Sequence, residues 1–487
     1  MTRDATGGQN RHSSEEARES GWSEGRKEDE CVRKDEVEIK ESKVSETVEQ
    51  ISEVRARWAW TEPSVWTDRM LVALEDGING VEETKWFCLI DKVCNPANLM
   101  AAYRRTASRK GTAGVDHVTI KGYAKSLGRN LARVREQLLG RTYRPSRIRR
   151  IHIPKSGGAE TRPLGIPTVE DRVVQTAVRH VIEPIFERTF AKRSYGFRPG
   201  RGCKDALRDV FHLMKDGELY IVDADLRQCF DRIPHGKLLD LIKEQIADKK
   251  VLSLIAGYLK QEILEDGVVT LPEGSGTPQG AALSPLLCNI YLNPLDHLME
   301  QSGFKMVRYA DDMVIACSSR EEAEAALRLL NEWVEANGLE LHPDKTRIAE
   351  LTETDEYFDF LGYRFTRTKK GRLGRYPSPK SEKRLREKLK KLTRRCNGKS
   401  MGEIINRCNK VLKGWYEYFK HTNQWTLKSL DGWVRMRLRS ILRKRRKRRG
   451  RGRGKDHQRW PNAYFAKLGL FSMYTVWADA ISPRERG

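Results

Sequence analysis

The chain has 487 residues, and 91 Lys and Arg against 67 Asp and Glu give it a formal net charge of +24 at pH 7. With 32% charged residues it has no apolar run long enough to span a bilayer, which excludes a membrane protein. Its nine cysteines are scattered, odd in number and never spaced Cys-x-x-Cys, which argues against a disulfide framework or structural zinc site and favours a reducing compartment.

The N-terminal residues 1–52 differ in charge from the rest of the chain. They carry nine Lys and Arg against fourteen Asp and Glu and have almost no periodic apolar face, so we expect a disordered, solvated tail. The tail has no apolar signal-peptide core and is too acidic for an organellar transit peptide. We therefore expect no export or import signal and a cytoplasmic location.

The next part of the chain changes from helical to mixed patterning. Residues 53–150 show helical patterns, among them one at 98–103 and a second that follows the turn 111–116. Residues 151–155 alternate like a strand, 156–158 are typical of a hairpin turn, and 162–167 resume an extended segment. A long helix is predicted to follow at 171–185.

In two further predicted β segments, aspartate residues stand at the end of a strand. Residues 219–225 indicate a buried strand that ends at Asp225, and 306–317 indicate two β-rich runs that meet at Asp311 and Asp312. Adjacent carboxylates in a hydrophobic hairpin would repel one another unless a cation neutralises them, and a divalent metal is the simplest neutraliser. By itself an Asp-Asp pair equally often caps a turn or faces solvent.

The C-terminal part is predicted to be helical and strongly basic. From residue 383 onward apolar residues recur at helical spacing, and residues 435–455 hold thirteen Lys and Arg and no acid. Because like charges this close repel one another, the run indicates a polyanionic partner, with a solvated face or a localisation tag as the alternatives.

Eight ordered blocks between about residues 98 and 471 resemble group II intron-encoded reverse transcriptases with maturase activity. Tyr309-Ala-Asp-Asp312 resembles the catalytic hairpin of that family. Residues 223–231 resemble the first palm motif, in which the acid five residues before the aromatic is the metal ligand, and this assigns Asp225 rather than Asp223. The other blocks are 162–167, 194–199, 276–280, 283–292, 338–345 and 358–363.

The resemblance implies an α+β fold, a right-hand polymerase with fingers and palm built on antiparallel sheet and followed by an α-helical thumb and maturase domain. The implied divisions are 53–150 for a helical N-terminal extension of the fingers, 151–370 for fingers and palm, 371–445 for thumb and maturase, and 446–487 for a short basic nucleic-acid-binding region. With no Cys after Cys408, we expect no Cys-paired His-Asn-His endonuclease.

The resemblance also implies site residues. Asp225, Asp311 and Asp312 would be catalytic and would hold two Mg²⁺ ions, with Mn²⁺ as the alternative metal. The predicted dNTP contacts are Lys155, Arg162, Phe230, Gln279 and Tyr309, and the predicted nucleic-acid contacts are Arg443, Lys444, Arg445, Arg446, Lys447 and Arg448.

Several of these residues have an ordinary structural alternative. Lys155 and Arg162 could be surface cations, Phe230 could be core rather than a ring under the deoxyribose, and Gln279 could belong to a plain turn. For the aromatic residues Trp415, Phe419 and Trp433, which could stack on RNA, we favour a place in a helix-bundle core.

The resulting hypothesis is an RNA-directed DNA polymerase that also binds group II intron RNA to promote splicing and supports mobility by target-primed reverse transcription. Its partners would be the intron RNA, an RNA template with a DNA primer, target DNA and dNTPs. The alternatives are an RNA-binding splicing factor with a vestigial polymerase, against which the intact acids argue, and a free-standing relative recruited to phage defence or CRISPR arrays.

Overall fold

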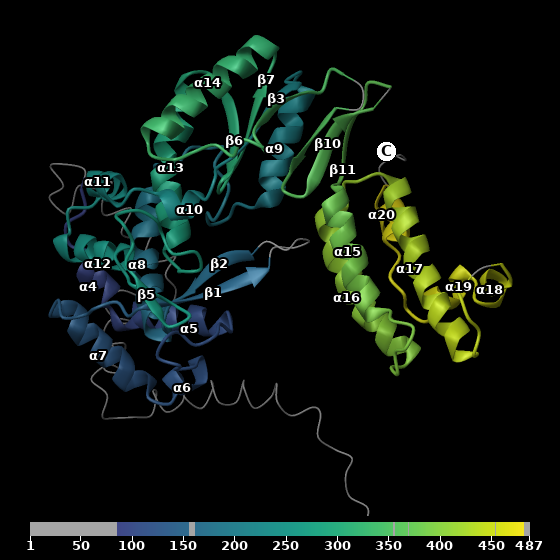
Figure 1. Cartoon of the computed structure of the whole chain (residues 1–487), viewed down its shortest axis with the longest axis horizontal. Helices are drawn as coiled ribbons and strands as arrows, with labels where there is room; N and C mark the ends of the chain where they lie inside the picture. Colours follow the sequence, from purple (N-terminus) through teal and green to yellow (C-terminus); the bar gives the residue numbers. More distant parts are fainter. Residues whose placement is uncertain (1–84, 155–160, 354–355, 369, 453, 482–487) are drawn as a thin grey trace, which may run out of the picture.

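A computed structural model describes residues 85–154, 161–353, 356–368, 370–452 and 454–481 (Figure 1). The predicted tail 1–52 and Lys155 lie outside the described residues. Among the helices within these ranges, none is long and apolar enough to cross a membrane.

The first described elements are helices, as the sequence predicts. They are α4 (Ile90–Val93), α5 (Pro96–Ser108), α6 (Ile120–Ala124) and α7 (Leu127–Leu139), and they pack with the long helix α8 (Val169–Glu187). α8 begins after Thr168, whose hydroxyl accepts a hydrogen bond from the Asp171 backbone N–H and so caps the helix.

A four-stranded sheet carries the predicted hairpin, and we call it the hairpin sheet. β1 (Ile148–Pro154) pairs antiparallel with β2 (Thr161–Ile166), which confirms the two extended segments. β4 (Ile263–Glu265) adds parallel to β1, and β5 (Val268–Thr270) completes the order β2-β1-β4-β5. The sequence does not predict β4 and β5.

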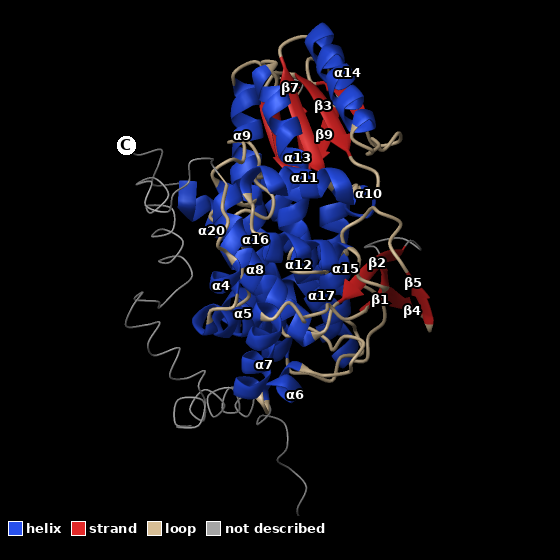
Figure 2. Cartoon of the chain, turned by 90° about the vertical axis from the view of Figure 1, so that its left-hand side faces the viewer, coloured by secondary structure: helices blue, strands red, loops and turns tan. Residues whose placement is uncertain are grey.

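The central sheet carries the acids. It consists of β6 (Lys305–Tyr309), β7 (Asp312–Cys317), β3 (Tyr220–Asp225) and β8 (Arg347–Glu350), in the order β6-β7-β3-β8 with every pair antiparallel. Figure 2 shows this sheet and the hairpin sheet as two separate groups of red arrows.

Alternation along the strands gives the central sheet two buried faces. Val222 and Ile315 belong to one apolar cluster with α13 (Ser284–Gln301) and α14 (Arg320–Ala336). Ile221 and Val314 belong to a second cluster with α9 (Cys203–Lys215) and the strands β9 (Tyr357–Phe360) and β10 (Tyr363–Arg367). Short helices complete this half of the chain: α10 (Cys229–Arg232), α11 (His235–Gln245) and α12 (Lys249–Leu259).

The remaining elements form a small sheet and a helical region. β9, β10 and β11 (Leu373–Pro377) are antiparallel neighbours, and the helices that follow are α15 (Pro379–Leu392), α16 (Met401–Phe419), α17 (Gln424–Arg445), α18 (Lys455–Arg459), α19 (Asn462–Lys467) and α20 (Met473–Ile481). Figure 1 shows α15 to α20 gathered beside the other elements. Phe419 is buried, whereas Trp415 and Trp433 are only partly buried against the apolar clusters.

Candidate active site

The register of the central sheet brings the three predicted acids together. Asp225, the last residue of β3, lies directly opposite Asp312, the first residue of β7, so their side chains leave the same face of the sheet. Asp311 precedes Asp312 in the turn between β6 and β7, where Ala310 adopts a left-handed conformation with φ 59°.

The carboxylates at this end of the sheet interact unfavourably with one another. Burial, with the neighbouring charges of Asp311 and Asp225, raises the pKa of Asp312 to about 7. Burial, with the charge of Asp225, also raises the pKa of Asp311. Asp223 lies on β3 with Asp225, and burial raises the pKa of Asp223 to about 6. A cation at this cluster would relieve the repulsion.

Lys345 supplies one such cation. Its ammonium forms an ion pair with the Asp225 carboxylate, and the His342 backbone N–H donates to the Asp225 carbonyl at 2.8 Å. Burial alone would lower the pKa of Lys345, but its hydrogen bond with Asp225 and the charges of the three acids raise it. Over the described ranges, no three His, Cys, Asp or Glu side chains converge closely enough to hold a metal ion in this conformation.

The sequence pattern does not single out Lys345, although the residue stands in the block 338–345. The loop after α14 carries it back to the end of β3, 120 residues earlier in the chain. Carboxylate oxygens are the donors that Mg²⁺ prefers, and Asp225 already binds an ammonium, so the chemistry of these side chains suits a divalent ion although they do not converge on one here.

A buried arginine holds the acid-bearing turn in place. The Arg308 guanidinium is fully buried, pairs with Asp296, and donates to the Ala310 carbonyl at 3.0 Å. It also donates to the Ser194 hydroxyl at 2.8 Å and to the Asn289 side-chain oxygen at 3.0 Å. These hydrogen bonds fix the carbonyl of the left-handed residue next to Asp311. The sequence pattern does not identify Arg308.

Three aromatic rings adjoin the acids. Phe197 lies 6.4 Å from Phe230 and 6.5 Å from Tyr309 between ring centroids. Phe230 is partly buried against the first apolar cluster, and Phe197 is 42% exposed. Gly196 sits so close to the turn that an added Cβ would lie 2.2 Å from the Ala310 nitrogen.

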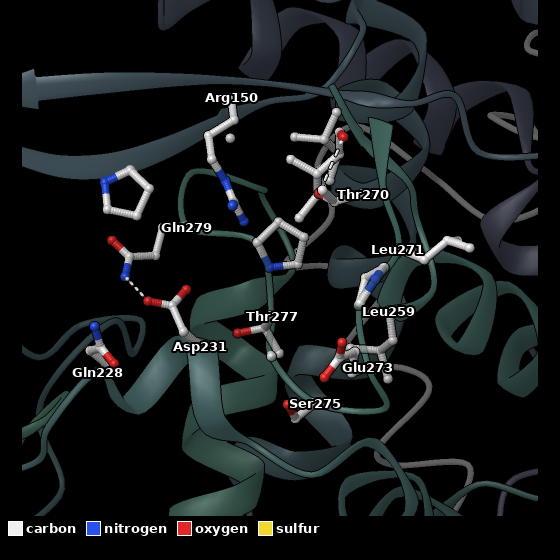
Figure 3. A pocket seen from close by; sticks show the side chains of 17 residues that line it. Arg150, Gln228, Asp231, Leu259, Thr270, Leu271, Glu273, Ser275, Thr277 and Gln279 are labelled. Carbon is white, nitrogen blue, oxygen red and sulfur yellow. Dashed lines mark hydrogen bonds between the residues drawn. The ribbon is translucent and has the colours of Figure 1, made fainter. Parts of the chain in front are cut away.

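Gln279 lines a cavity of about 420 Å³ between the hairpin sheet and α10 (Figure 3). Its amide donates to the Asp231 carboxylate at 3.1 Å, and Arg150 points into the same space. Gly280, at φ 107°, lies where an added Cβ would be 2.5 Å from the Gly165 carbonyl, so its loop packs directly on β2.

The predicted triphosphate and nucleic-acid contacts lie on surfaces. Arg162 is exposed on β2 opposite Ile153, in the hairpin whose turn is outside the described residues. Residues Lys444, Arg445, Arg446, Lys447 and Arg448 are exposed at the end of α17 and just beyond it. Arg443 differs from them because it pairs with the buried Asp456 at 2.5 Å.

The acid-bearing sheet and its helices are those of a polymerase of the reverse transcriptase class. The family described as "Reverse transcriptase (RNA-dependent DNA polymerase)" matches residues 153–365, and "Group II intron, maturase-specific domain" matches residues 382–460. The chain belongs to the family of group II intron-encoded reverse transcriptases that carry a maturase domain.

Individual relatives are similar to parts of the chain. "Group II intron-encoded protein LtrA" of Lactococcus lactis subsp. cremoris is 38% identical over 215 residues, which are 44% of this chain and only 35% of that protein. "Protein YkfC" of Escherichia coli K12 is 32% identical over 360 residues, covering 66% of this chain and 88% of that protein. Among solved structures, a chain of a "Partial Cas6-RT-Cas1--Cas2 complex" aligns at 22% identity and TM-score 0.33, over 52% of this chain and 42% of that one.

Proposed function

We propose that the chain is an RNA-directed DNA polymerase encoded by a group II intron, and that it also binds the intron RNA to promote splicing. In this proposal it supports intron mobility by copying RNA from a primer in the target DNA. The observation that carries the proposal is the placement of Asp225 opposite Asp312, with Asp311 in the adjoining turn, inside the reverse transcriptase match.

The three acids would hold two Mg²⁺ ions, with Mn²⁺ as the alternative metal. Such ions activate a primer 3′-hydroxyl and neutralise the charge that develops on the leaving pyrophosphate. The raised pKa of Asp312 supports this role, because the clustered carboxylates lack sufficient counter-charge of their own. Lys345 would neutralise Asp225 until the metal site fills.

The dNTP would lie between the acids and the hairpin sheet. Lys155 and Arg162 would bind its triphosphate, Arg162 as a planar fork and Lys155 as a point charge. Phe230, supported by Phe197, would pack under the deoxyribose and exclude a 2′-hydroxyl. Tyr309 and Gln279 would complete the nucleotide pocket, with Asp231 orienting the Gln279 amide.

We propose the division of labour that the sequence suggests: 53–150 extend the fingers, 151–370 form fingers and palm, 371–445 form thumb and maturase, and 446–487 bind nucleic acid. Intron RNA, primed RNA template and target DNA would be the polyanionic partners of this basic chain. We also propose a cytoplasmic location, which suits the free cysteines found throughout the described residues.

Primer extension on an RNA template tests the polymerase assignment. Asp311→Asn should lower the rate of dNTP incorporation by several orders of magnitude because it removes charge from the metal site. Asp266→Asn, in the exposed turn between β4 and β5, makes the same chemical change away from the acids and should leave the rate unchanged. Extension by Asp311→Asn at the rate of wild type would contradict the assignment.

A further inference from the structure

The helical region carries a group of exposed and partly buried aromatic side chains that the proposed polymerase site does not use. Trp425, in the first turn of α17, is 69% exposed. Lys428, one turn later, places its ammonium 5.0 Å from the centroid of the Trp425 ring. The same ammonium lies 4.3 Å from the centroid of the Tyr474 ring on α20. Tyr474 in turn stacks on Trp477, with centroids 6.2 Å apart and planes 25° apart.

The helix that carries two of these rings is capped by a side chain of α17. The buried carboxylate of Asp431, on α17, accepts hydrogen bonds from the Ser472 hydroxyl at 2.8 Å and from the Met473 and Tyr474 backbone N–H groups at 3.2 and 3.0 Å. Asp431 therefore caps α20 and fixes it against α17.

A second lysine and aromatic pair connects α16 with the segment before α20. Asn409 accepts from the Phe471 backbone N–H at 2.9 Å and donates to the Gly469 carbonyl at 2.7 Å, which anchors the segment before α20. The ammonium of Lys413 lies 5.8 Å from the centroid of the Phe471 ring. One lysine and aromatic pair thus joins α16 to the segment before α20, and another joins α17 to α20.

A lone exposed indole is ordinary, but Trp425 shares the Lys428 ammonium with the ring of Tyr474, and aromatic rings gathered beside a cation offer a stacking surface. A lysine set over rings on a chain of net charge +24 favours an anionic partner with flat faces. Unpaired nucleotides combine both features: the base stacks on a ring, and the phosphate meets the ammonium.

We propose that Trp425, Lys428, Tyr474 and Trp477 form a stacking platform for unpaired nucleotides of RNA. The inference rests on the proposed binding of intron RNA, and it names where a single-stranded segment would lie. Trp425 and Lys428 fall inside the maturase match 382–460, whereas Tyr474 and Trp477 lie beyond it. The platform would therefore join the maturase region to the C-terminal helix.

Binding of a polyuridine RNA oligonucleotide by the full chain tests the platform. Trp425→Ala should weaken binding by about 5- to 150-fold, the range found when one base loses its aromatic partner. Trp425→Phe should retain most of the affinity. Val268→Ala shortens an apolar side chain of β5 that is 62% exposed, and it should have no effect.

Salt dependence separates stacking from charge. Trp425→Ala should leave the slope of log affinity against log salt unchanged, whereas Lys428→Gln should reduce its magnitude by about 0.7 because one phosphate is no longer neutralised. A blunt-ended RNA duplex, which has no unpaired nucleotides, should bind Trp425→Ala and wild type equally. Equal losses of affinity on the duplex and on polyuridine would overturn the platform, and so would a loss seen with polythymidine DNA but not with RNA.

Photo-crosslinking gives a direct readout. RNA that carries 5-iodouridine should crosslink to peptides containing Trp425, Tyr474 or Trp477. Bound RNA that crosslinks elsewhere but not to these peptides would overturn the inference. Failure of the wild-type chain to extend a primer on an RNA template would instead refute the proposed function.

Discussion

At the scale of single residues, gathering the acids at the ends of β3 and β7 has a cost in folding free energy. Asp312 ionises at the ordinary value of 3.8 in an unfolded chain, but burial and the charges of Asp311 and Asp225 raise its pKa to about 7 in the folded one. Between these two values the folded chain binds more protons, so this residue's contribution to stability falls as pH rises through that window. Above about pH 7 Asp312 is ionised in both states, and its charge then destabilises the folded chain by the full amount.

We predict that Asp312→Asn stabilises the metal-free chain. Thermal unfolding in EDTA should show a higher Tm for the variant than for wild type at about pH 8, and the difference should narrow as the pH is lowered toward about 5. Added Mg²⁺ should raise the Tm of wild type more than that of the variant, since an ion that binds only the folded state stabilises it. A variant no more stable than wild type at about pH 8 would contradict the electrostatic account.

The sequence identifies residues whose spacing is unusual and misses those whose role depends on distant partners. Asp225, Asp311 and Asp312 stand at strand ends, and a pattern of β-rich runs is enough to place them. Lys345 and Arg308 are ordinary cations in a chain with 91 of them, and only the fold brings them to Asp225 and to the Ala310 carbonyl. No local signal distinguishes them.

At the scale of elements, the hairpin β6–β7 depends on a buried ion pair. Arg308 and Asp296 are both buried, and the arginine also bonds the turn that precedes Asp312. We predict that Arg308→Met lowers the free energy of unfolding by about 3–5 kcal/mol, because Asp296 is left as an uncompensated buried charge. Urea unfolding measures this difference.

A second variant separates charge from shape. Arg308→Met combined with Asp296→Leu removes both charges and should recover much of the lost stability. Primer extension should be impaired in both the single and the double variant, because the Ala310 carbonyl lacks its donor in each. If Arg308→Met alone unfolds at the same urea concentration as wild type, the ion pair does not support the hairpin.

Elements with local patterns are predictable from the sequence and elements with distant partners are not. The strands β1, β2, β3, β6 and β7 and the helix α8 agree with the sequence prediction. β4 has three residues and pairs parallel with β1, more than a hundred residues earlier. So short a strand shows no clear alternation, and its partner can be known only from the fold.

At the scale of the whole molecule, the basic end of α17 should contribute to binding through charge. The exposed cations Lys444, Arg445, Lys447 and Arg448 are suitable for neutralisation, whereas Arg443 holds Asp456 and should be kept. We predict that replacing these four by Gln weakens binding of single-stranded RNA and reduces the magnitude of the slope of log affinity against log salt. The reduction should be about 0.7 for each phosphate that the variant no longer neutralises.

A charge-preserving control accompanies that measurement. Arg445→Lys with Arg448→Lys keeps every charge, so its salt slope should match that of wild type. An unchanged slope in the neutralised variant would show that this cluster lies outside the nucleic-acid interface.

The central claim is that one chain joins a metal-dependent polymerase to an RNA-binding surface that does not need the acids. The direct measurement uses a double variant that carries both Asp311→Asn and Asp312→Asn. Its primer extension and its promotion of splicing of the cognate intron RNA are compared with those of wild type. The double variant should lose extension because the metal site has lost two charges. It should still promote splicing, because it gains positive charge and keeps its RNA-binding helices. Loss of splicing with RNA binding intact, or retention of extension, would contradict the account.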